Sequence, residues 1–241
     1  MFCNYCGAQL DPGAMFCTSC GQSLAAPAPV SALPIVPAPF AGRPLGPLVP
    51  AGEIRARTGA WLGAGWDLVK ADLSSFLLAS LLVLILMGVV PLILQGPLIA
   101  GLLIFCRNRI LARRSEIGDI FQGFNFFVPT LVATLLIGLF TFGGMLLCII
   151  PAFVLAGMYQ FTYLFIVDKK MDFWPAMQAS HAVVKNDYLG FTLFVVAGGL
   201  LNLLGILCCL VGVFLTFPIY YAALAFAYQE TVGFEPDTPG R

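Results

Sequence analysis

Residues 120–167 read IFQGFNFFVPTLVATLLIGLFTFGGMLLCIIPAFVLAGMYQFTYLFIV, and this stretch contains no Asp, Glu, Lys or Arg. A transmembrane helix needs roughly 20 apolar residues, so the stretch is long enough to cross a bilayer twice. Pro151 lies near its middle. Because proline fits the first turn of a helix but breaks a helix interior, the sequence predicts two crossing helices joined by a turn near residues 147–151.

Two further stretches without charged residues flank this one, at 73–106 and 188–229, and each has its own breaker, Gly96-Pro97 in the first and Gly212 followed by Pro218 in the second. Unbroken helices of this length would be too long for a membrane. We therefore expect an all-α polytopic membrane protein with six transmembrane helices, arranged as three repeated proline-broken hairpins with turns near 93–97, 147–151 and 211–218. The expected crossings are about 73–94, 97–113 (with Arg107 and Arg109 snorkelling to the headgroups), 127–148, 151–168, 188–211 and 216–230.

The composition excludes several classes of protein. Hydrophobic residues make up 60% of the chain and charged residues only 10%, against about 25% charged in a soluble domain. Too few polar groups exist to cover the surface of a soluble globular protein, and disorder over most of the chain is excluded as well. Lys and Arg balance Asp and Glu at 12 each. A protein that binds nucleic acid through bulk positive charge is therefore not expected.

An internal repeat is indicated by two segments that precede charge-free stretches, GWDLVKADLSSF at 65–76 and SHAVVKNDYLGF at 180–191. Both contain the pattern V-K-x-D-x-x-x-F, and apolar bias does not place Lys and Asp at a fixed spacing. The segment before 127 is a looser match that lacks both. The match favours one unit used three times, each with an approach segment and a hairpin. Small residues follow each central proline and predict close helix packing: Ala100, Gly101, Ala156, Gly157, Ala222 and Ala223.

The basic residues predict the orientation of the chain. They precede the first crossing and lie between the hairpins, whereas the hairpin turns contain no Lys or Arg. The positive-inside rule then places both termini and both inter-hairpin loops in the cytoplasm. Within residues 53–70, the side chains of Ile54, Trp61 and Leu68 share one helical face, which predicts an interfacial helix lying on the membrane. The three tryptophans, Trp61, Trp66 and Trp174, are expected to form an aromatic belt at the inner interface.

The first 24 residues have a different composition and contain two C-x-x-C pairs, each followed by glycine. The two-residue gap lets both thiolates of a pair reach one ion, and the glycine permits the tight turn. Four thiolates in a tetrahedral array favour Zn²⁺, with iron as the main competitor. Disulfides are disfavoured because this end is expected in the reducing cytoplasm. We therefore predict a small N-terminal zinc ribbon with four cysteine ligands over residues 1–24, the metal ligands being Cys3, Cys6, Cys17 and Cys20.

The predicted zinc is structural, because four cysteine ligands leave no open coordination position and so short a segment needs the metal to fold. The ribbon contains Asp11 and no Lys or Arg. Its negative charge excludes nucleic acid as an expected partner. The ribbon is expected either to contact a protein partner, for which the side chains of Phe2, Tyr5 and Phe16 offer an apolar patch, or to have no binding role.

The remaining segments complete the predicted domain organisation. Residues 25–52 are rich in Pro and Ala and are expected to form an extended polyproline-II linker. Residues 53–232 form the six-helix membrane domain, and residues 233–241 form a C-terminal tail. The other cysteines are expected to pack as apolar side chains. A disulfide between the second and third hairpins is the alternative for those near the outer turns. The residues concerned are Cys106, Cys148, Cys208 and Cys209.

The chain resembles known families in two parts. The paired C-x-x-C-G knuckles, the proline-rich tether and the multi-pass body resemble the zinc-ribbon-headed membrane proteins of bacteria. The body carries Gly96-Pro97, the stretch 118–124, the turn ending Ile149-Ile150-Pro151, Asp168 and Phe217-Pro218. On these residues it resembles an uncharacterised bacterial multi-pass family, related to the membrane domains of some glycerophosphodiester phosphodiesterases.

The resemblance implies a location in the bacterial cytoplasmic (inner) membrane. His181 stands where that family usually has an aromatic residue, so the resemblance assigns no role to it. The chain contains no phosphodiesterase catalytic domain, so that activity is not implied.

The function expected from these features is that of a non-enzymatic scaffold or regulator with a cytoplasmic zinc-binding docking head. We expect no ionisable residue within a crossing, and the polar residues there are neutral: Gln95, Thr134, Thr141, Gln160, Thr162, Asn202 and Thr216. A small-solute or lipid transporter or channel is the alternative, disfavoured because the helix breaks fall at the outer turns and not at mid-membrane. An intramembrane enzyme is disfavoured because no catalytic motif is present and His181 is the one histidine.

Overall fold

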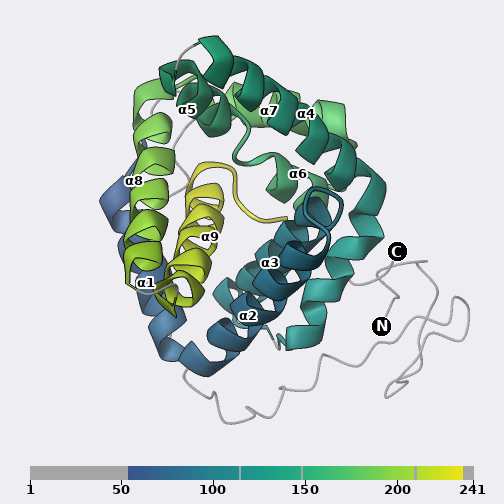
Figure 1. Cartoon of the computed structure of the whole chain (residues 1–241), viewed down its shortest axis with the longest axis vertical. Coiled ribbons are helices and arrows are strands. Elements are labelled where there is room, and N and C mark those ends of the chain that lie inside the picture. Colours follow the sequence, from purple (N-terminus) through teal and green to yellow (C-terminus); the bar gives the residue numbers. More distant parts are fainter. Residues whose placement is uncertain (1–53, 114, 148, 209–210, 236–241) are drawn as a thin grey trace, which may run out of the picture. The chain divides into compact units, whose positions relative to one another are not determined.

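The structure is a computed structural model that describes residues 54–113, 115–147, 149–208 and 211–235. The described residues belong to the second of two units of the chain, Pro39–Arg241. Their regular elements are all helical, and none of them forms a β-strand. In chain order (Figure 1) the helices are α1 Thr58–Ala71, α2 Leu73–Val89, α3 Gln95–Ile110, the 3₁₀-helix η1 Ile117–Phe126, α4 Phe127–Leu147, α5 Ile149–Met158, α6 Thr162–Asp168, α7 Phe173–Val184, α8 Tyr188–Leu207 and α9 Val211–Thr231.

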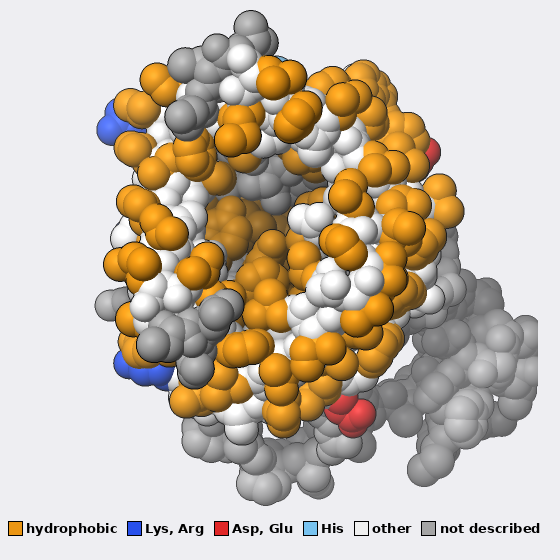
Figure 2. All heavy atoms as spheres, in the orientation of Figure 1, with side chains coloured by type: hydrophobic (Ala, Val, Ile, Leu, Met, Phe, Trp, Pro, Cys, Tyr) orange, Lys and Arg blue, Asp and Glu red, His pale blue; other side chains and the backbone are white. Residues whose placement is uncertain are grey.

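Several of these helices are long and apolar enough to cross a membrane. Four segments meet that test, Ile117–Leu146, Ile150–Asp168, Tyr188–Leu207 and Gly212–Thr231. A fifth arises if α1 and α2, which are bent by 103° relative to each other, count as one broken span. Large apolar side chains are exposed along these helices, and Figure 2 shows them covering most of the visible face. An exposed apolar surface of this extent is what a lipid environment requires of a protein.

Proline marks where four of the helices begin. The third residue of each is a proline, at Pro97 in α3, Pro129 in α4, Pro151 in α5 and Pro175 in α7. The first turn of a helix has no internal acceptor for its N–H groups, so the missing proline donor costs nothing there. The helix starts predicted at Gly96-Pro97 and Pro151 are therefore present in the structure.

The third predicted break, at 211–218, is wrong in its position. Helix α9 begins at Val211 and continues through Pro218. A proline inside a helix leaves the carbonyl four residues earlier without its N–H donor, here that of Phe214. The Ser80 hydroxyl of α2 lies 2.8 Å from this Phe214 oxygen and donates to it, at a shorter distance than the 3.0 Å to Leu77 O on its own helix. A neighbouring hydroxyl thus satisfies the freed carbonyl, which is how transmembrane helices tolerate proline.

The V-K-x-D-x-x-x-F pattern has the same local structure in both places. Asp72 precedes α2 and accepts a hydrogen bond from Ser75 N at 3.3 Å, and Asp187 precedes α8 and accepts one from Gly190 N at 2.9 Å. Each aspartate is therefore a helix N-cap. The valines and phenylalanines of the pattern are fully buried on either side of the cap, at Val69, Phe76, Val184 and Phe191. The pattern thus specifies the junction between an approach helix and a long helix.

Helix α1 uses its predicted apolar face to pack on protein rather than on lipid. Trp61 and Leu68 of α1 are buried, and so is Ile54, which precedes the helix. At Gly65 an added Cβ would lie 2.7 Å from the carbonyl oxygen of Ile219 in α9, so only glycine permits this crossing. Trp61 is therefore a core residue and not part of an aromatic belt, because its neighbours on α9 exclude it from the interface. Trp66 and Trp174 are exposed, as the belt requires.

Helix α3 is enclosed by the rest of the body, and glycine makes this packing possible too. Its residues from Gly96 to Arg107 are all buried. An added Cβ on Gly101 would overlap the carbonyl oxygen of Ile120, and one on Gly123 would overlap that of Pro97. Backbone contact between α3 and η1 confirms the close approach predicted for Gly101.

A double-mutant cycle tests the role of Ser80. Replacing it (Ser80→Ala) leaves the Phe214 carbonyl without a donor and should lower the free energy of unfolding by about 1–3 kcal/mol. Pro218→Ala restores a backbone N–H to that carbonyl, so the same serine change in the Pro218→Ala protein should cost less than about 0.5 kcal/mol. Unfolding by SDS in mixed micelles measures both values. An equal loss in the two backgrounds would contradict the proposed hydrogen bond.

Candidate functional site: buried charges at the helix ends

The predicted zinc ligands Cys3, Cys6, Cys17 and Cys20 lie outside the described residues. The donor set itself fits the metal, because four thiolates satisfy tetrahedral Zn²⁺ without any further ligand. Within the part of the chain that the structure describes, no group of three or more His, Cys, Asp or Glu side chains could hold a metal ion. The four N-terminal cysteines therefore stay the predicted zinc ligands.

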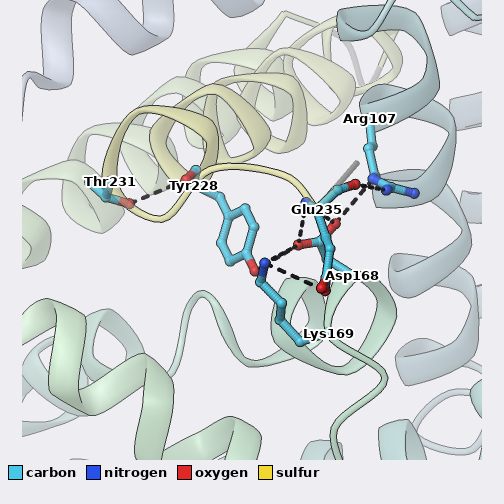
Figure 3. Close-up of polar contacts among 6 residues, drawn as sticks. All are labelled: Arg107, Asp168, Lys169, Tyr228, Thr231 and Glu235. Carbon is cyan, nitrogen blue, oxygen red and sulfur yellow. Dashed lines mark hydrogen bonds and ion pairs between the residues drawn. The ribbon is translucent and has the colours of Figure 1, made fainter. Parts of the chain in front are cut away.

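A cluster of charges around the buried carboxylate of Asp168 lies at the end of α6 (Figure 3). The Asp168 side chain has no exposed surface, and its Oδ1 lies 3.2 Å from Nε of Arg107 near the end of α3. The hydroxyl of Tyr228 in α9 donates to Asp168 Oδ2 at 3.2 Å. Three helices are therefore joined at one carboxylate. Lys169 adds a second cation, with Nζ 3.6 Å from Asp168 Oδ2.

The segment after α9 folds back onto this cluster. The backbone N–H of Glu235 donates to both oxygens of Asp168, at 3.2 and 3.3 Å, and its carbonyl accepts from Arg107 Nη2 at 3.0 Å. Its carboxylate lies 3.6 Å from Lys169 Nζ. The Arg107 guanidinium stands 5.7 Å from the ring centroid of Phe234. The Arg107–Asp168 pair thus holds the end of the described chain as well as the helices.

A second buried acid lies near the end of α9. Glu230 is 8% exposed. Its Oε2 accepts a hydrogen bond of 2.5 Å from the indole N–H of Trp61, and its Oε1 lies 3.1 Å from Nη1 of Arg57. The contacts join α9 to the start of α1. In the same region Asp187 Oδ2 accepts from the backbone N–H of Ala56 at 3.0 Å, which ties the start of α8 to the same segment.

These contacts correct two predictions made from the sequence. The prediction that no ionisable residue lies within a crossing is wrong, because Asp168 and Glu230 belong to candidate spans. The prediction that Arg107 and Arg109 snorkel to headgroups is wrong for Arg107, which is buried against Asp168. Arg109 reaches Asp72 instead, at 2.6 Å. The sequence feature that could have indicated these contacts is the acid within each span, since an ionisable residue there is expected to have a specific partner.

A further correction concerns mid-span helix breaks. The span Ile150–Asp168 is interrupted between α5 and α6, halfway along its length. Ser180 of α7 bridges the gap, since its hydroxyl donates to Met158 O at 2.7 Å and accepts from Phe161 N at 3.2 Å. Both side-chain polar atoms of Gln160 and the hydroxyl of Thr162 are buried without a hydrogen-bond partner. The expectation that breaks fall only at the outer turns is therefore wrong.

The other singled-out residues lie apart from these contacts. His181 Nε2 and the Tyr188 hydroxyl are 2.6 Å apart on the surface, at the junction of α7 and α8. Cys106 is buried, as predicted, and Cys208 is exposed and free. Cys148 and Cys209 lie outside the described residues, so the predicted alternative of a disulfide there stays a prediction. Asn202 of α8 accepts a 3.1 Å hydrogen bond from Thr216 of α9, the helix-to-helix role expected of neutral polar groups in a membrane.

Removing one partner of the Arg107–Asp168 ion pair tests how much this pair contributes to stability. Asp168→Asn removes the carboxylate charge that lies 3.2 Å from Arg107 Nε and should lower the free energy of unfolding by about 3–5 kcal/mol. The matched control is Asp67→Asn, whose pair with Lys70 is exposed and spans 3.7 Å, so the loss should stay below about 1 kcal/mol. SDS titration measures both. If the two variants lost similar amounts of unfolding free energy, the buried Asp168 pair would stabilise the protein no more than an exposed pair does.

The comparisons with known proteins bear on the N-terminus. Residues 2–24 match the family model described as a zinc-ribbon domain, which confirms the predicted ribbon and implies zinc binding. No curated protein and no solved structure matches the chain. The chain is thus similar to a zinc-ribbon domain at its N-terminus, and the helices that follow have the length and composition of a membrane protein.

Proposed function

We propose that this chain is a membrane-bound docking protein, in which a six-crossing body holds a cytoplasmic zinc ribbon that binds a protein partner and performs no catalysis itself. The observation that carries the proposal is that charged side chains of the body pair with one another between helices. Arg107 pairs with Asp168, Arg109 with Asp72 and Arg57 with Glu230. Each of these pairs joins two helix ends, which suits a rigid mount better than an acid–base or ion-coupled site.

The same ion pairs support six crossings in three hairpins. Arg109 near the end of α3 contacts Asp72 at the start of α2, so α3 returns to the side from which α2 departs. Helix α3 has 16 residues, shorter than the length of a usual span. Because it is enclosed by protein, it need not match the full thickness of the hydrocarbon. An even number of crossings places both termini on one side, which the positive-inside rule makes the cytoplasm.

Cysteine labelling tests this topology. In a protein whose Cys148, Cys208 and Cys209 are replaced by serine, a membrane-impermeant maleimide added outside should react with Ile93→Cys and Ile150→Cys. It should not react with Leu111→Cys or Asp172→Cys until the membrane is permeabilised. Modification is read by mass shift on a gel. The reverse pattern would overturn the orientation, and labelling of both Ile93→Cys and Leu111→Cys would remove α3 from the set of crossings.

The zinc ribbon and its tether support docking as the role of the head. A ribbon with four thiolate ligands has no open coordination position for catalysis, so the metal serves to fold a small surface. Residues 25–52 are rich in proline, a composition that favours an extended spacer of about 3.1 Å per residue. A head on such a tether reaches partners away from the bilayer surface while the body stays in it.

Zinc retention and partner binding should be lost together. The wild-type full chain should hold about one zinc per chain by elemental analysis, and Cys3→Ser with Cys6→Ser should hold none. Cys208→Ser is the matched control and should keep the metal. Quantitative cross-linking in cells should then find proteins enriched with the wild type and the control but lost with the double variant. Zinc in the double variant would contradict the ribbon ligands, and unchanged cross-links would contradict docking.

A solute pathway is the second candidate function, and the break between α5 and α6 favours it. Broken helices at mid-membrane occur at the substrate sites of transporters. Gln160 and Thr162 bring unsatisfied neutral polar atoms to such a break. Figure 2 shows a hollow near the centre of the visible face. Neutral groups of this kind fit water or a small uncharged solute rather than an ion.

Stopped-flow light scattering distinguishes this candidate from the docking protein. Proteoliposomes of a solute channel should be more permeable to water or glycerol than protein-free vesicles. Gln160→Leu removes the amide at the break and should return the rate to the protein-free level. Gln95→Leu, at the start of α3, is the control and should leave the rate unchanged. Equal permeability of wild-type and protein-free vesicles to both solutes would leave docking as the function of the chain.

A further inference from the structure

Three tyrosines of the body lie near one another, Tyr220 and Tyr221 on α9 and Tyr163 on α6. The rings of Tyr220 and Tyr221 meet edge to face, with their centroids 5.3 Å apart. The phenol groups of Tyr163 and Tyr220 both lie within electrostatic range of that of Tyr221. Two helices that are far apart in the sequence therefore bring three neutral hydroxyl groups into one region of the body.

The hydrogen bonds of these tyrosines leave two donors and one acceptor open. Thr134 has one hydroxyl hydrogen, which it donates to Thr130 O at 2.7 Å. The Tyr163 hydroxyl, 3.0 Å from Thr134 Oγ1, is therefore the donor of the hydrogen bond between them, and its own lone pairs stay open. The hydroxyls of Tyr220 and Tyr221 have no hydrogen-bond partner among the residues that the structure describes.

The space that the α9 tyrosines reach lies inside the body rather than in the lipid. No large apolar side chain described on α9 is exposed, and this helix packs against α1, α2, α3 and α8. Tyr220 and Tyr221 are nevertheless only half-buried, and neither hydroxyl oxygen is among the fully buried polar atoms without a partner. Figure 2 shows a hollow near the centre of the visible face with hydrophobic side chains around it, and Figure 1 shows α9 next to this centre.

Apolar contacts fix the rings of the two α9 tyrosines. Phe194 of α8 stacks on Tyr220 with the centroids 5.6 Å apart, and Phe217 packs on Tyr221 at 4.8 Å. Gly198 of α8 lies so close to the Tyr220 ring that an added Cβ would overlap it. The rings are therefore held by their hydrocarbon neighbours, and their hydroxyl groups are open to a ligand.

We propose that the three tyrosines bind the hydroxyl group of a neutral lipid alcohol, whose hydrocarbon part lies along the apolar walls of the hollow. An alcohol oxygen accepts two hydrogen bonds and donates one. This inventory matches Tyr220 and Tyr221 as donors and Tyr163 as the acceptor, whereas an ester or ketone carbonyl has no hydrogen for Tyr163. The aromatic surroundings favour a ligand with a hydrocarbon chain over water alone, because the chain buries apolar surface.

Lipid retention by the detergent-purified full chain tests the proposal. Native mass spectrometry should show dioleoylglycerol or the isoprenoid alcohol geranylgeraniol bound to the wild type, and the one that binds more tightly identifies the source of the alcohol. The methyl ether of each lipid keeps the oxygen but lacks its hydrogen. It should bind about tenfold more weakly than the alcohol, because nothing donates to Tyr163.

Two variants separate the roles of the tyrosines. In Tyr163→Phe the affinity for the alcohol should fall to that for its methyl ether, since the group that accepts the hydrogen is gone. Tyr221→Phe should weaken both ligands by about tenfold, because the oxygen of each accepts from this hydroxyl. Tyr188→Phe is the matched control, since it removes a hydroxyl that contacts His181 at the surface, and it should leave both affinities unchanged. The melting temperature of each variant checks that it is folded.

Three results would overturn the proposal. Retention of neither alcohol would leave the hydroxyls to water. Equal binding of alcohol and methyl ether by the wild type would show that the hydroxyl group is not recognised, and an unchanged ratio in Tyr163→Phe would remove Tyr163 from the site. Because the zinc ribbon takes no part in this binding, a negative result leaves the docking function in place, and a failure of docking leaves this site in place.

Discussion

The Arg107–Asp168 ion pair is the contact on which the arrangement of the helix ends depends. In a bilayer no water is available to replace a lost partner, so a buried charge has to be neutralised inside the protein. Asp168 meets this requirement with α3, α9 and the segment ending at Glu235 at once. A buried pair is weak evidence for net stability, because desolvation offsets the Coulomb attraction. Its consequence is specificity of arrangement, since another placement of α6 would separate the Asp168 carboxylate from Arg107, Tyr228 and the Glu235 N–H.

The local features of the fold could be predicted from the sequence because their causes are local. A proline in the first turn, as at Pro97 and Pro151, acts only through its own backbone, and an N-cap such as Asp187 needs only the next three residues. Trp61, Arg107 and Pro218 were misassigned for the opposite reason. Their positions depend on Glu230, Asp168 and Ser80, which lie far away in the sequence. Residue type predicts that a partner is needed but does not identify it.

Pro151 and Pro218 show how one residue type has two outcomes. The N–H that Pro151 lacks would have had no acceptor in the first turn of α5, so a helix start follows at no cost. Pro218 lies in the interior of α9, where the missing N–H frees the Phe214 carbonyl. The helix continues because α2 packs beside it with a serine at that level. Whether the helix breaks or continues at a proline inside it therefore depends on whether a neighbouring helix supplies a donor for the freed carbonyl.

The helix ends and the break between α5 and α6 differ in whether their polar groups have partners. At the helix ends three ion pairs join different elements, Arg57 with Glu230, Arg107 with Asp168 and Arg109 with Asp72, so these ends are tied to one another. At the break between α5 and α6 the reverse holds, because Gln160 and Thr162 have polar atoms without partners. A buried amide without partners costs free energy unless a water or solute completes it. Helix ends joined by ion pairs suit the proposed mount for a tethered head, and the break with unsatisfied polar groups is the feature that such a mount does not require.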